Sequence, residues 1–233
     1  MEDLERYGDY NDTDEIEEDD GGKKKIPVLK ILIAVVFAAV LGLLGYRLYL
    51  FDYYPKEIRS VLPTDALVAY WEETDGNVDA RTQELRFPYD DSKEGNFFCG
   101  YLTVIPAIGE LQIAVRLNTS SLIALSEKYG TEISAENCRD YLQFRLTDNY
   151  GRDYGEAADS VFAEKSMYRY FRLAFDGVAF DGADDGLGAP EWIRLEIFVR
   201  GQDEPFSCVL LYENNEAYSA FSPVTVKRSE VIE

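Results

Sequence analysis

One uncharged apolar run near the N-terminus constrains the fold more than any other feature of the sequence. From Ile31 to Tyr46 the sequence ILIAVVFAAVLGLLGY contains no charged residue, and apolar residues resume at Leu48 to Phe51. Together they reach the roughly 20 positions that a helix needs to cross the hydrocarbon core of a bilayer. The run is apolar on all sides, whereas a helix on a soluble core normally has a polar stripe. We therefore predict a single membrane-spanning helix.

The residues at the two ends of this run favour a retained anchor over a cleaved signal peptide. Lys30 and Arg47 are long enough for their charges to reach the headgroups. An aromatic belt is predicted at the exit side, formed by Tyr46, Tyr49, Tyr53 and Tyr54. A signal peptide begins with a short basic region and ends at small residues, but here a long acidic tail precedes the run.

The basic residues on either side of the run predict its orientation. Lys23, Lys24 and Lys25 are clustered before the run, whereas the basic residues after it are dispersed. Because clustered Lys and Arg favour the cytoplasmic side, we expect a cytoplasmic N-terminus and an extracytoplasmic C-terminal domain at the cell membrane.

The distribution of charge divides the chain into four predicted regions. Residues 1–22 carry eleven Asp or Glu and one Arg, and are expected to be a disordered acidic tail. Residues 23–51 form the basic flank and the transmembrane helix. Residues 52–65 are predicted to be a juxtamembrane stalk or cap with a short helix, and residues 66–233 a β-sandwich domain. This last region and the stalk together have a net charge of −16, which repels phosphate backbones and argues against a nucleic acid partner.

Four segments alternate apolar and polar residues with the period of a β-strand. The alternation is clearest over 110–117, where the odd positions are Leu, Ile, Val and Leu and the even positions are Glu, Gln, Ala and Arg. The pattern recurs over 142–147, 170–175 and 193–200. Such alternation is typical of antiparallel strands with one buried and one solvated face.

Weaker strand patterns and one helix complete the predicted domain. The weaker strands are Ala66–Glu72, Gln83–Phe87, Asn96–Ile105, Phe206–Glu213 and Ala217–Val226, with connections at Pro106–Gly109 and Gly201–Pro205. A helix is predicted over Thr119–Tyr129, since hydroxyl residues open it and Gly130 can end it. About eight or nine strands with one or two short helices indicate an antiparallel β-sandwich, immunoglobulin-like or jelly-roll-like. A smaller barrel with an appended helix is the alternative.

Catalytic motifs are missing from the sequence. It contains no His, which excludes Ser-His-Asp and Cys-His catalysis and nearly all imidazole metal sites. It also lacks G-x-S-x-G, S-x-x-K and P-loop patterns. Acidic pairs could hydrolyse glycosides, but carboxylates are so numerous that no pair is distinguished. We therefore predict a protein that is not an enzyme.

Two loops with several carboxylates beside glycines could bind Ca²⁺ outside a cell. One covers residues 148–153, and the other supplies Asp176, Asp181, Asp184 and Asp185 as candidate ligands. Neither has the spacing of an EF-hand. The interpretation as solvated turns is the alternative, and no other cofactor is expected.

Exposed aromatic rings are the candidate ligand-binding residues. Phe198, Tyr170 and Trp192 fall on the outward rows or near the ends of their predicted strands, where rings could stack on sugars. The alternative is that a helix or loop covers them.

Among the three cysteines, Cys99 and Cys208 are the pair we would expect to form a disulfide. The alternative, and the commoner role of such cysteines, is that of small buried apolar residues.

Small residues line one face of the apolar run. Ala34, Ala38 and Gly42 recur every four residues and would let a second helix approach, which predicts a homodimer within the bilayer.

The sequence as a whole predicts a membrane-anchored, non-enzymatic surface protein that binds a protein or an envelope component. A tethered carbohydrate-binding module is the alternative, and a tethered glycosidase is a weaker one.

Overall fold

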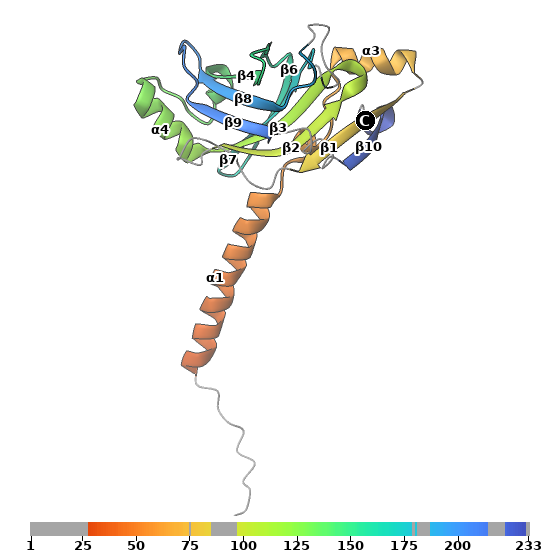
Figure 1. Cartoon of the computed structure of the whole chain (residues 1–233). Coiled ribbons are helices and arrows are strands. Elements are labelled where there is room, and N and C mark those ends of the chain that lie inside the picture. Colours follow the sequence, from red (N-terminus) through yellow and green to blue (C-terminus); the bar gives the residue numbers. More distant parts are fainter. Residues whose placement is uncertain are drawn as a thin grey trace, which may run out of the picture. The chain divides into compact units, whose positions relative to one another are not determined.

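The structure is a computed structural model that describes residues 28–74, 76–84, 97–178, 180, 187–213 and 222–231 (Figure 1). Its contacts divide the chain into two compact units, residues 1–50 and 51–233. The predicted acidic tail lies outside the described residues, as does the lysine cluster at 23–25.

The N-terminal unit contains the predicted apolar helix. Helix α1 (Val28–Asp52) has 25 residues, and its Leu29–Tyr49 segment has a mean hydropathy of 2.4. None of that segment is buried in the structure. The prediction of one continuous helix, long and apolar enough to cross a membrane, is thus confirmed.

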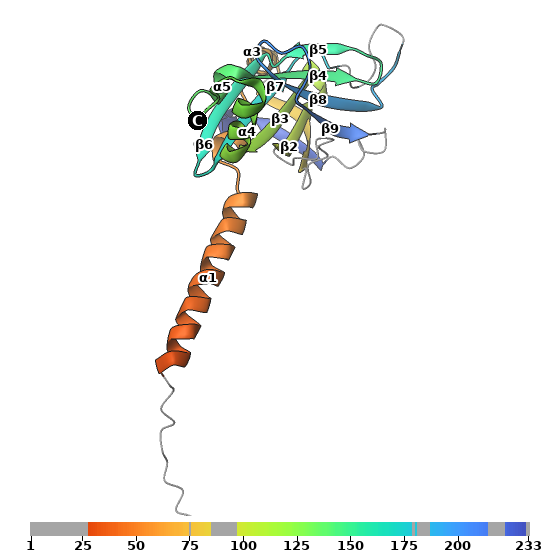
Figure 2. The same ribbon diagram turned by 90° about the vertical axis from the view of Figure 1, so that its left-hand side faces the viewer.

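The second unit is built mainly from two antiparallel sheets. The six-stranded sheet has the order β10-β1-β2-β3-β7-β6, and the four-stranded sheet has the order β5-β4-β8-β9. The strands of the first sheet are β1 (Asn77–Glu84), β2 (Phe97–Ile105), β3 (Glu110–Asn118), β6 (Asp159–Lys165), β7 (Tyr168–Phe175) and β10 (Ser222–Lys227). Those of the second are β4 (Leu142–Asp148), β5 (Asp153–Glu156), β8 (Trp192–Val199) and β9 (Ser207–Glu213). The four-stranded sheet lies over the six-stranded sheet as a second layer, which gives a sandwich-like, mainly antiparallel fold (Figure 1, Figure 2).

The main core lies between the two sheets and is built by the alternations found in the sequence. On β3, Leu111, Ile113, Val115 and Leu117 are fully buried and join residues of β2, β4, β7, β8 and β9 in one cluster. Ile113 pairs with Leu102 of β2 and with Leu173 of β7, so apolar residues meet across three neighbouring strands. The four strongest predicted strands are therefore confirmed as β3, β4, β7 and β8.

Helix α4 (Thr119–Tyr129) has the predicted bounds, but its N-cap is Asn118 and not one of the hydroxyl residues expected to cap it. The side chain of Asn118 caps it by accepting a hydrogen bond from the backbone N–H of Ser120, at 3.2 Å. Gly130 ends it with a φ of +62°, a conformation that favours glycine. The helix α5 (Cys138–Tyr141) and the 3-10 turn η1 (Pro106–Ile108) are short, as is the C-terminal helix α7 (Arg228–Val231). Helices α4 and α3 lie toward opposite ends of the domain (Figure 1).

The strand predicted at Ala66–Glu72 is wrong, because these residues form helix α3 (Asp65–Glu73). The hydroxyl of Thr64 accepts a hydrogen bond from the N–H of Leu67 and so starts the helix. Leu67 and Trp71, four residues apart, then face the sheet and pack with Val78, Ala80, Ile105 and Val226. A short apolar run fits both the two-residue period of a strand and the 3.6-residue period of a helix, and burial against the rest of the fold decides which one forms.

Two strands were not predicted, and one was predicted in part. β5 and β6 have few apolar residues and half-exposed side chains, so their alternation is weak. β1 begins at Asn77, six residues before the predicted start, and residues 85–96 lie outside the described ones. β2, β9 and β10 overlap the weaker strands that the sequence predicts.

Residues 53–64, which we call the juxtamembrane cap, cover the outer face of the six-stranded sheet. Tyr54 is buried there, and its ring meets those of Tyr101 and Tyr170 edge-on, with centroids 5.3 Å apart in both pairs. The ring lies over Gly100, where an added Cβ would come within 2.6 Å of the Tyr54 hydroxyl. Helix α2 (Lys56–Arg59) follows, and its Ile58 is fully buried.

The end of the cap is fixed by hydrogen bonds to β3. The side-chain amide of Gln112 accepts from the N–H of Leu62 at 2.7 Å and donates to the Leu62 carbonyl at 2.8 Å, as a neighbouring strand would. The Thr64 hydroxyl donates to the carboxylate of Glu110, which also accepts from Gln112 at 2.6 Å. The cap is therefore joined to the sheet by side chains from two adjacent outward positions.

A fully buried arginine lies beneath this junction. Arg172 of β7 donates to Gln112 at 3.2 Å, to the hydroxyl of Thr103 at 2.8 Å and to the carbonyl of Tyr101 at 3.2 Å. Burial lowers the pKa of its guanidinium to about 9, and the charge of Glu110 opposes that shift. Burial raises the pKa of Glu110, while its hydrogen bonds to Thr64 and Gln112 act in the opposite direction. The outer face thus holds a connected polar network under the cap.

The cap corrects two expectations from the sequence. The outward row of β3 is buried as completely as the inward row, so it is not the solvated face that alternation predicts. Most of the segment 52–65, predicted to be a stalk or cap, packs against the sheet through Tyr54, Ile58 and Thr64, so it is a cap and not a free stalk. Tyr54 also leaves the predicted aromatic belt, because its ring belongs to the domain.

The expected pairing of Cys99 with Cys208 is wrong, since all three cysteines are thiols. Cys99 lies in the core between the sheets. Cys208 is half-exposed between Ser207 and Val209, which are both buried, so its side chain points to the other face of β9. Cys138 is buried, and burial raises the pKa of its thiol.

Candidate functional site

Two of the three predicted ligand-binding rings are covered. Tyr170 is fully buried, because Tyr54 and Ile58 of the juxtamembrane cap lie over it. Phe198 is on the outward row of β8, but it is only 6% exposed, and the guanidinium of Arg145 lies 5.6 Å from its ring centroid. Trp192 is half-exposed at the start of β8. Of the three predicted rings, Trp192 is therefore the one that a ligand could reach.

Beside Trp192 is the turn that connects β4 to β5, organised by a buried aspartate. Asp148 accepts hydrogen bonds from the backbone N–H groups of Tyr150 and Arg152, at 2.9 and 3.0 Å. Its other oxygen accepts from the Arg152 guanidinium at 3.0 Å and from the Tyr154 hydroxyl at 2.8 Å. Burial, followed by the hydrogen bond to Asp148, raises the pKa of Tyr154 to about 12.

These contacts give Asp148 a structural role. Its side chain is fully buried and accepts four hydrogen bonds, one of them from a cation that neutralises its charge. The loop 148–153 is thereby closed on itself by its own donors, in the manner of an Asx turn. This geometry favours the interpretation of the loop as a structural turn over the interpretation as a cation site.

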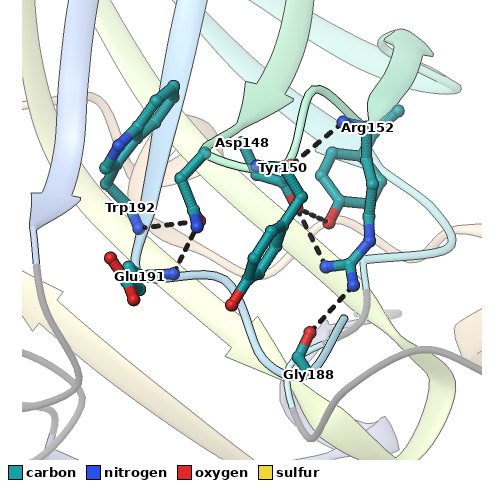
Figure 3. Close-up of polar contacts among 8 residues, drawn as sticks. Asp148, Tyr150, Arg152, Gly188, Glu191 and Trp192 are labelled. Carbon is teal, nitrogen blue, oxygen red and sulfur yellow. Dashed lines mark hydrogen bonds and ion pairs between the residues drawn. The ribbon is translucent and has the colours of Figure 1, made fainter. Parts of the chain in front are cut away.

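The turn is also tied to the chain that enters β8 (Figure 3). The guanidinium of Arg152 donates to the carbonyl of Gly188 at 2.8 Å. The side-chain oxygen of Asn149 accepts from the N–H of Glu191 at 2.7 Å and from that of Trp192 at 3.4 Å. Two segments about forty residues apart in sequence are therefore held in one arrangement.

This arrangement places the rings of Tyr150 and Trp192 at the same end of the four-stranded sheet. We call these two residues, together with Glu191 beside Trp192, the aromatic surface. Tyr150 is 37% exposed, and Glu191 is exposed beside the half-exposed Trp192. Arginines lie over both rings: Arg152 is 4.9 Å from the Tyr150 centroid, and Arg194 is 5.0 Å from that of Trp192. In Figure 3, Tyr150 lies between Trp192 and Arg152 in this view.

The aromatic surface presents two kinds of chemical group, aromatic rings and charged side chains. Exposed faces of Tyr and Trp stack on apolar or π surfaces, and the adjacent carboxylate and guanidinium groups can form hydrogen bonds with a polar ligand. Trp192 was predicted from the sequence, whereas Tyr150 was not. Its position directly after a strand, in a turn that contains Asp148 and Gly151, is the signal that could have identified it.

A shallow groove of about 680 Å³ lies over β1 and β10, beside α3 and η1. Its lining residues are Tyr70, Asn77, Asp79, Ala80, Arg81, Pro106, Ala107, Pro223, Val224 and Thr225. They include neither Cys nor Lys, and Asp79 is their one carboxylate. The groove thus has no pair of carboxylates for glycoside chemistry among these residues.

The predicted calcium ligands fall mostly outside the described residues. Asp176 is exposed just after β7, whereas Asp181, Asp184 and Asp185 belong to the stretch 181–186, which the structure does not describe. Within the described residues, no group of three or more Cys, Asp or Glu side chains could hold a metal ion. The calcium site stays a prediction.

The small residues of α1 lie on one face of the helix, as their four-residue spacing predicts. Ala34, Ala38 and Gly42 are all exposed on a continuous helix, at intervals of four residues. The proposed pairing of two such helices stays a prediction.

Comparisons with known proteins give no relative for this chain: no family model, no curated protein and no solved structure matches it.

Proposed function

We propose that this chain is a single-pass membrane protein whose β-rich domain is a non-enzymatic binding module. Two observations support the proposal: no residue of the apolar segment Leu29–Tyr49 is buried, and the chain that follows forms a folded domain of two sheets. In water the exposed side chains of Leu29–Tyr49 would be unfavourable, whereas a bilayer satisfies them. The lipid bilayer is therefore the first proposed partner.

We place the domain outside the cytoplasm at the cell membrane. This orientation is supported by the lysine cluster at 23–25, before the helix. Protease added to sealed spheroplasts would degrade the domain in this orientation and leave the N-terminal tail protected. Degradation of the tail with protection of the domain would reverse the assignment.

The aromatic surface carries the proposal that the domain binds a ligand. Tyr150 and Trp192 remain accessible while a closed set of hydrogen bonds fixes the backbone of both. Rigid exposed rings lose little conformational entropy when they bind, which is why Tyr and Trp dominate interface energetics. The partner we propose is a protein or an envelope component.

A carbohydrate ligand is the second candidate, and one observation favours it. Two rings with adjoining charged groups, Glu191 and Arg152, offer both stacking faces and hydrogen-bonding groups to a pyranose. A glycosidase is the least supported function, since the carboxylate of Asp148 is neutralised by Arg152 and already accepts hydrogen bonds on both oxygens.

The immunoglobulin-like and jelly-roll-like alternatives for the fold stay predictions.

The decisive experiment uses the full chain in its own membrane with a photo-crosslinking amino acid in place of Tyr150. A discrete crosslinked product that is lost when Trp192→Ala is added would support a protein partner. The matched control places the crosslinker at Tyr129 of α4, a half-buried ring that also has a cation, Lys128, 5.1 Å from its centroid. Products that are the same from both positions would contradict the proposal.

The carbohydrate alternative is tested with the full chain in nanodiscs on an array of envelope polysaccharides. Trp192→Ala should weaken binding by about ten-fold or more if the ring is an anchor, and Tyr129→Ala should not. Binding that is equal for both variants would remove this alternative. Release of free sugar by the wild-type chain would instead support the glycosidase.

A further inference from the structure

The first residues after α1 are packed against the end of β6, which lies more than a hundred residues later in the sequence. The ring of Tyr53 has the ammonium of Lys165 at 4.2 Å and the guanidinium of Arg59 at 4.8 Å from its centroid. Arg59 also donates a hydrogen bond to the Tyr53 hydroxyl at 3.3 Å. Lys165 ends β6 and begins the β6–β7 turn, where Ser166 has a φ of +55°. The turn and the start of the juxtamembrane cap therefore form one local unit.

The covalent chain keeps this unit close to any bilayer that α1 crosses. The apolar segment ends at Tyr49, four residues before Tyr53. Because an extended chain spans at most about 3.6 Å per residue, Tyr53 lies within roughly 15 Å of the end of the apolar segment. Arg59 and Lys165 contact Tyr53 directly, so both lie in or near the headgroup region. This step rests on the proposed function, in which α1 spans the membrane.

Two basic side chains contact the ring of Tyr53, in a domain that is acidic as a whole. Lys56 and Arg59 are exposed on α2, and Lys165 is half-exposed. In the sequence, Asp52, Glu57 and Glu164 are the carboxylates that adjoin these residues, and that of Glu164 pairs with Arg169 at 3.4 Å. Residues 52–233 carry a net charge of −16, yet both charged groups that contact the Tyr53 ring are cations.

We propose that Arg59 and Lys165, which both contact the ring of Tyr53, bind the phosphate groups of anionic lipids, together with Lys56, which is exposed on the same short helix as Arg59. Basic residues at a membrane surface attract anionic headgroups, and aromatic rings favour the same interfacial layer. The β6–β7 turn would then be a second point of contact with the bilayer, in addition to the covalent one. Two points of contact would limit how the domain tilts and would keep one side of it toward the membrane.

The test measures the selectivity of the full chain for spin-labelled phosphatidylglycerol over phosphatidylcholine in vesicles. Arg59→Gln and Lys165→Gln should each lower the relative association constant by up to about five-fold at low salt. Lys165→Arg keeps the charge and should restore the wild-type value. The control is Lys227→Gln on β10, an exposed lysine on the opposite edge of the same sheet from β6, which should change nothing.

Each other outcome overturns one specific claim. If alkaline extraction removes the wild-type chain from phosphatidylcholine vesicles, α1 does not span the bilayer and the proposed function fails. If the chain is retained but Arg59→Gln and Lys165→Gln leave the selectivity unchanged, or Lys227→Gln lowers it equally, only the lipid site is wrong. If inorganic phosphate at millimolar concentration abolishes the selectivity difference between wild type and Lys165→Gln, the site binds free phosphate and not lipid.

Discussion

On β3, neighbouring residues point to opposite faces of the six-stranded sheet and meet different surroundings. Leu111, Ile113 and Val115 belong to an apolar cluster that includes residues of the four-stranded sheet. Glu110 and Gln112 meet the juxtamembrane cap and the guanidinium of Arg172. Both faces are buried to the same extent, but the inner face is held by apolar packing, whereas the outer face has a polar network beside the packed rings of Tyr54 and Tyr170.

The difference between these faces lies in how many arrangements each tolerates. Apolar burial is non-directional and scales with area, so the inner face stabilises the fold without selecting one fine geometry. A buried hydrogen-bond network is favourable only when every member is satisfied. The outer face therefore accepts the cap in the one position that satisfies Leu62, Thr64 and Arg172 together. We infer that the sheet supplies stability on one side and a defined attachment of the cap on the other.

The largest effect is expected at the buried charge. Arg172→Met would leave the carbonyl of Tyr101 and the carboxylate of Glu110 without the guanidinium that compensates them. Removing one member of a buried ionic network costs roughly 3–5 kcal/mol of unfolding free energy. Urea denaturation of the full chain in micelles, followed by tryptophan fluorescence, would measure it.

The double variant Glu110→Gln, Arg172→Met serves as the control for this prediction. Removing both charges should recover at least half of the loss, since no uncompensated carboxylate remains. A double variant as unstable as Arg172→Met alone would mean that packing, and not charge, explains the effect.

Adjacent residues of β3 provide the sharpest contrast between the faces. Ile113→Ala and Gln112→Ala should each lower the unfolding free energy by about 3 kcal/mol, through a cavity in one case and unsatisfied polar groups in the other. Only Gln112→Ala should also release the cap. Trypsin under native conditions would then cut after Lys56 and Arg59 faster in Gln112→Ala than in the equally destabilised Ile113→Ala. Equal cleavage rates would refute the idea that the polar face fixes the cap.

A smaller effect is expected from Gly100→Ala, beneath the ring of Tyr54. The new Cβ would lie 2.6 Å from the Tyr54 hydroxyl, so the ring has to move. Overpacking of this kind costs about 2 kcal/mol. Adding Tyr54→Leu should remove the clash and recover part of the decrease in the urea concentration at the unfolding midpoint. No rescue by the second substitution would show that the cap tolerates a displaced ring.

The smallest effect is a pH dependence of the outer face. Burial raises the pKa of Glu110, so the folded chain holds that proton more tightly than the unfolded chain does. The contribution of this group to stability is therefore greatest below its unfolded pKa and is lost as pH rises through the folded pKa. Urea midpoints from about pH 4 to about pH 7 should fall more for the wild type than for Glu110→Gln. A wild-type midpoint that rises relative to Glu110→Gln over this range would contradict the assignment.

Much of the domain could be predicted from local patterns, and the errors have a common cause. The alternation over 110–117 and the cap and glycine stop of α4 act within a few residues, so they are legible in the sequence. Tyr170 and Phe198 were assigned to open faces because alternation separates two rows without saying what covers either. The segment 66–72 was assigned to a strand because its helical face becomes apparent only when Leu67 and Trp71 meet the sheet.

The candidate site divides in the same way. Trp192 could be chosen from the sequence because it is a large ring at the start of a patterned strand. The place of Tyr150 beside it depends on two hydrogen bonds to residues about forty positions away: Asn149 accepts one from the N–H of Glu191, and Arg152 donates one to the carbonyl of Gly188. No local pattern contains such contacts.

By itself the sequence determined the apolar helix, the inner rows of the main strands and the bounds of α4, because periodicity and capping are local properties. Only the tertiary structure decided that the outer row of β3 is buried, that Tyr54 belongs to the domain and that the turn after β4 is joined to Gly188 and Glu191. The physical reason is that burial of a face depends on which distant segment lies over it. A polar residue has the same identity in the sequence whether it faces water or Arg172.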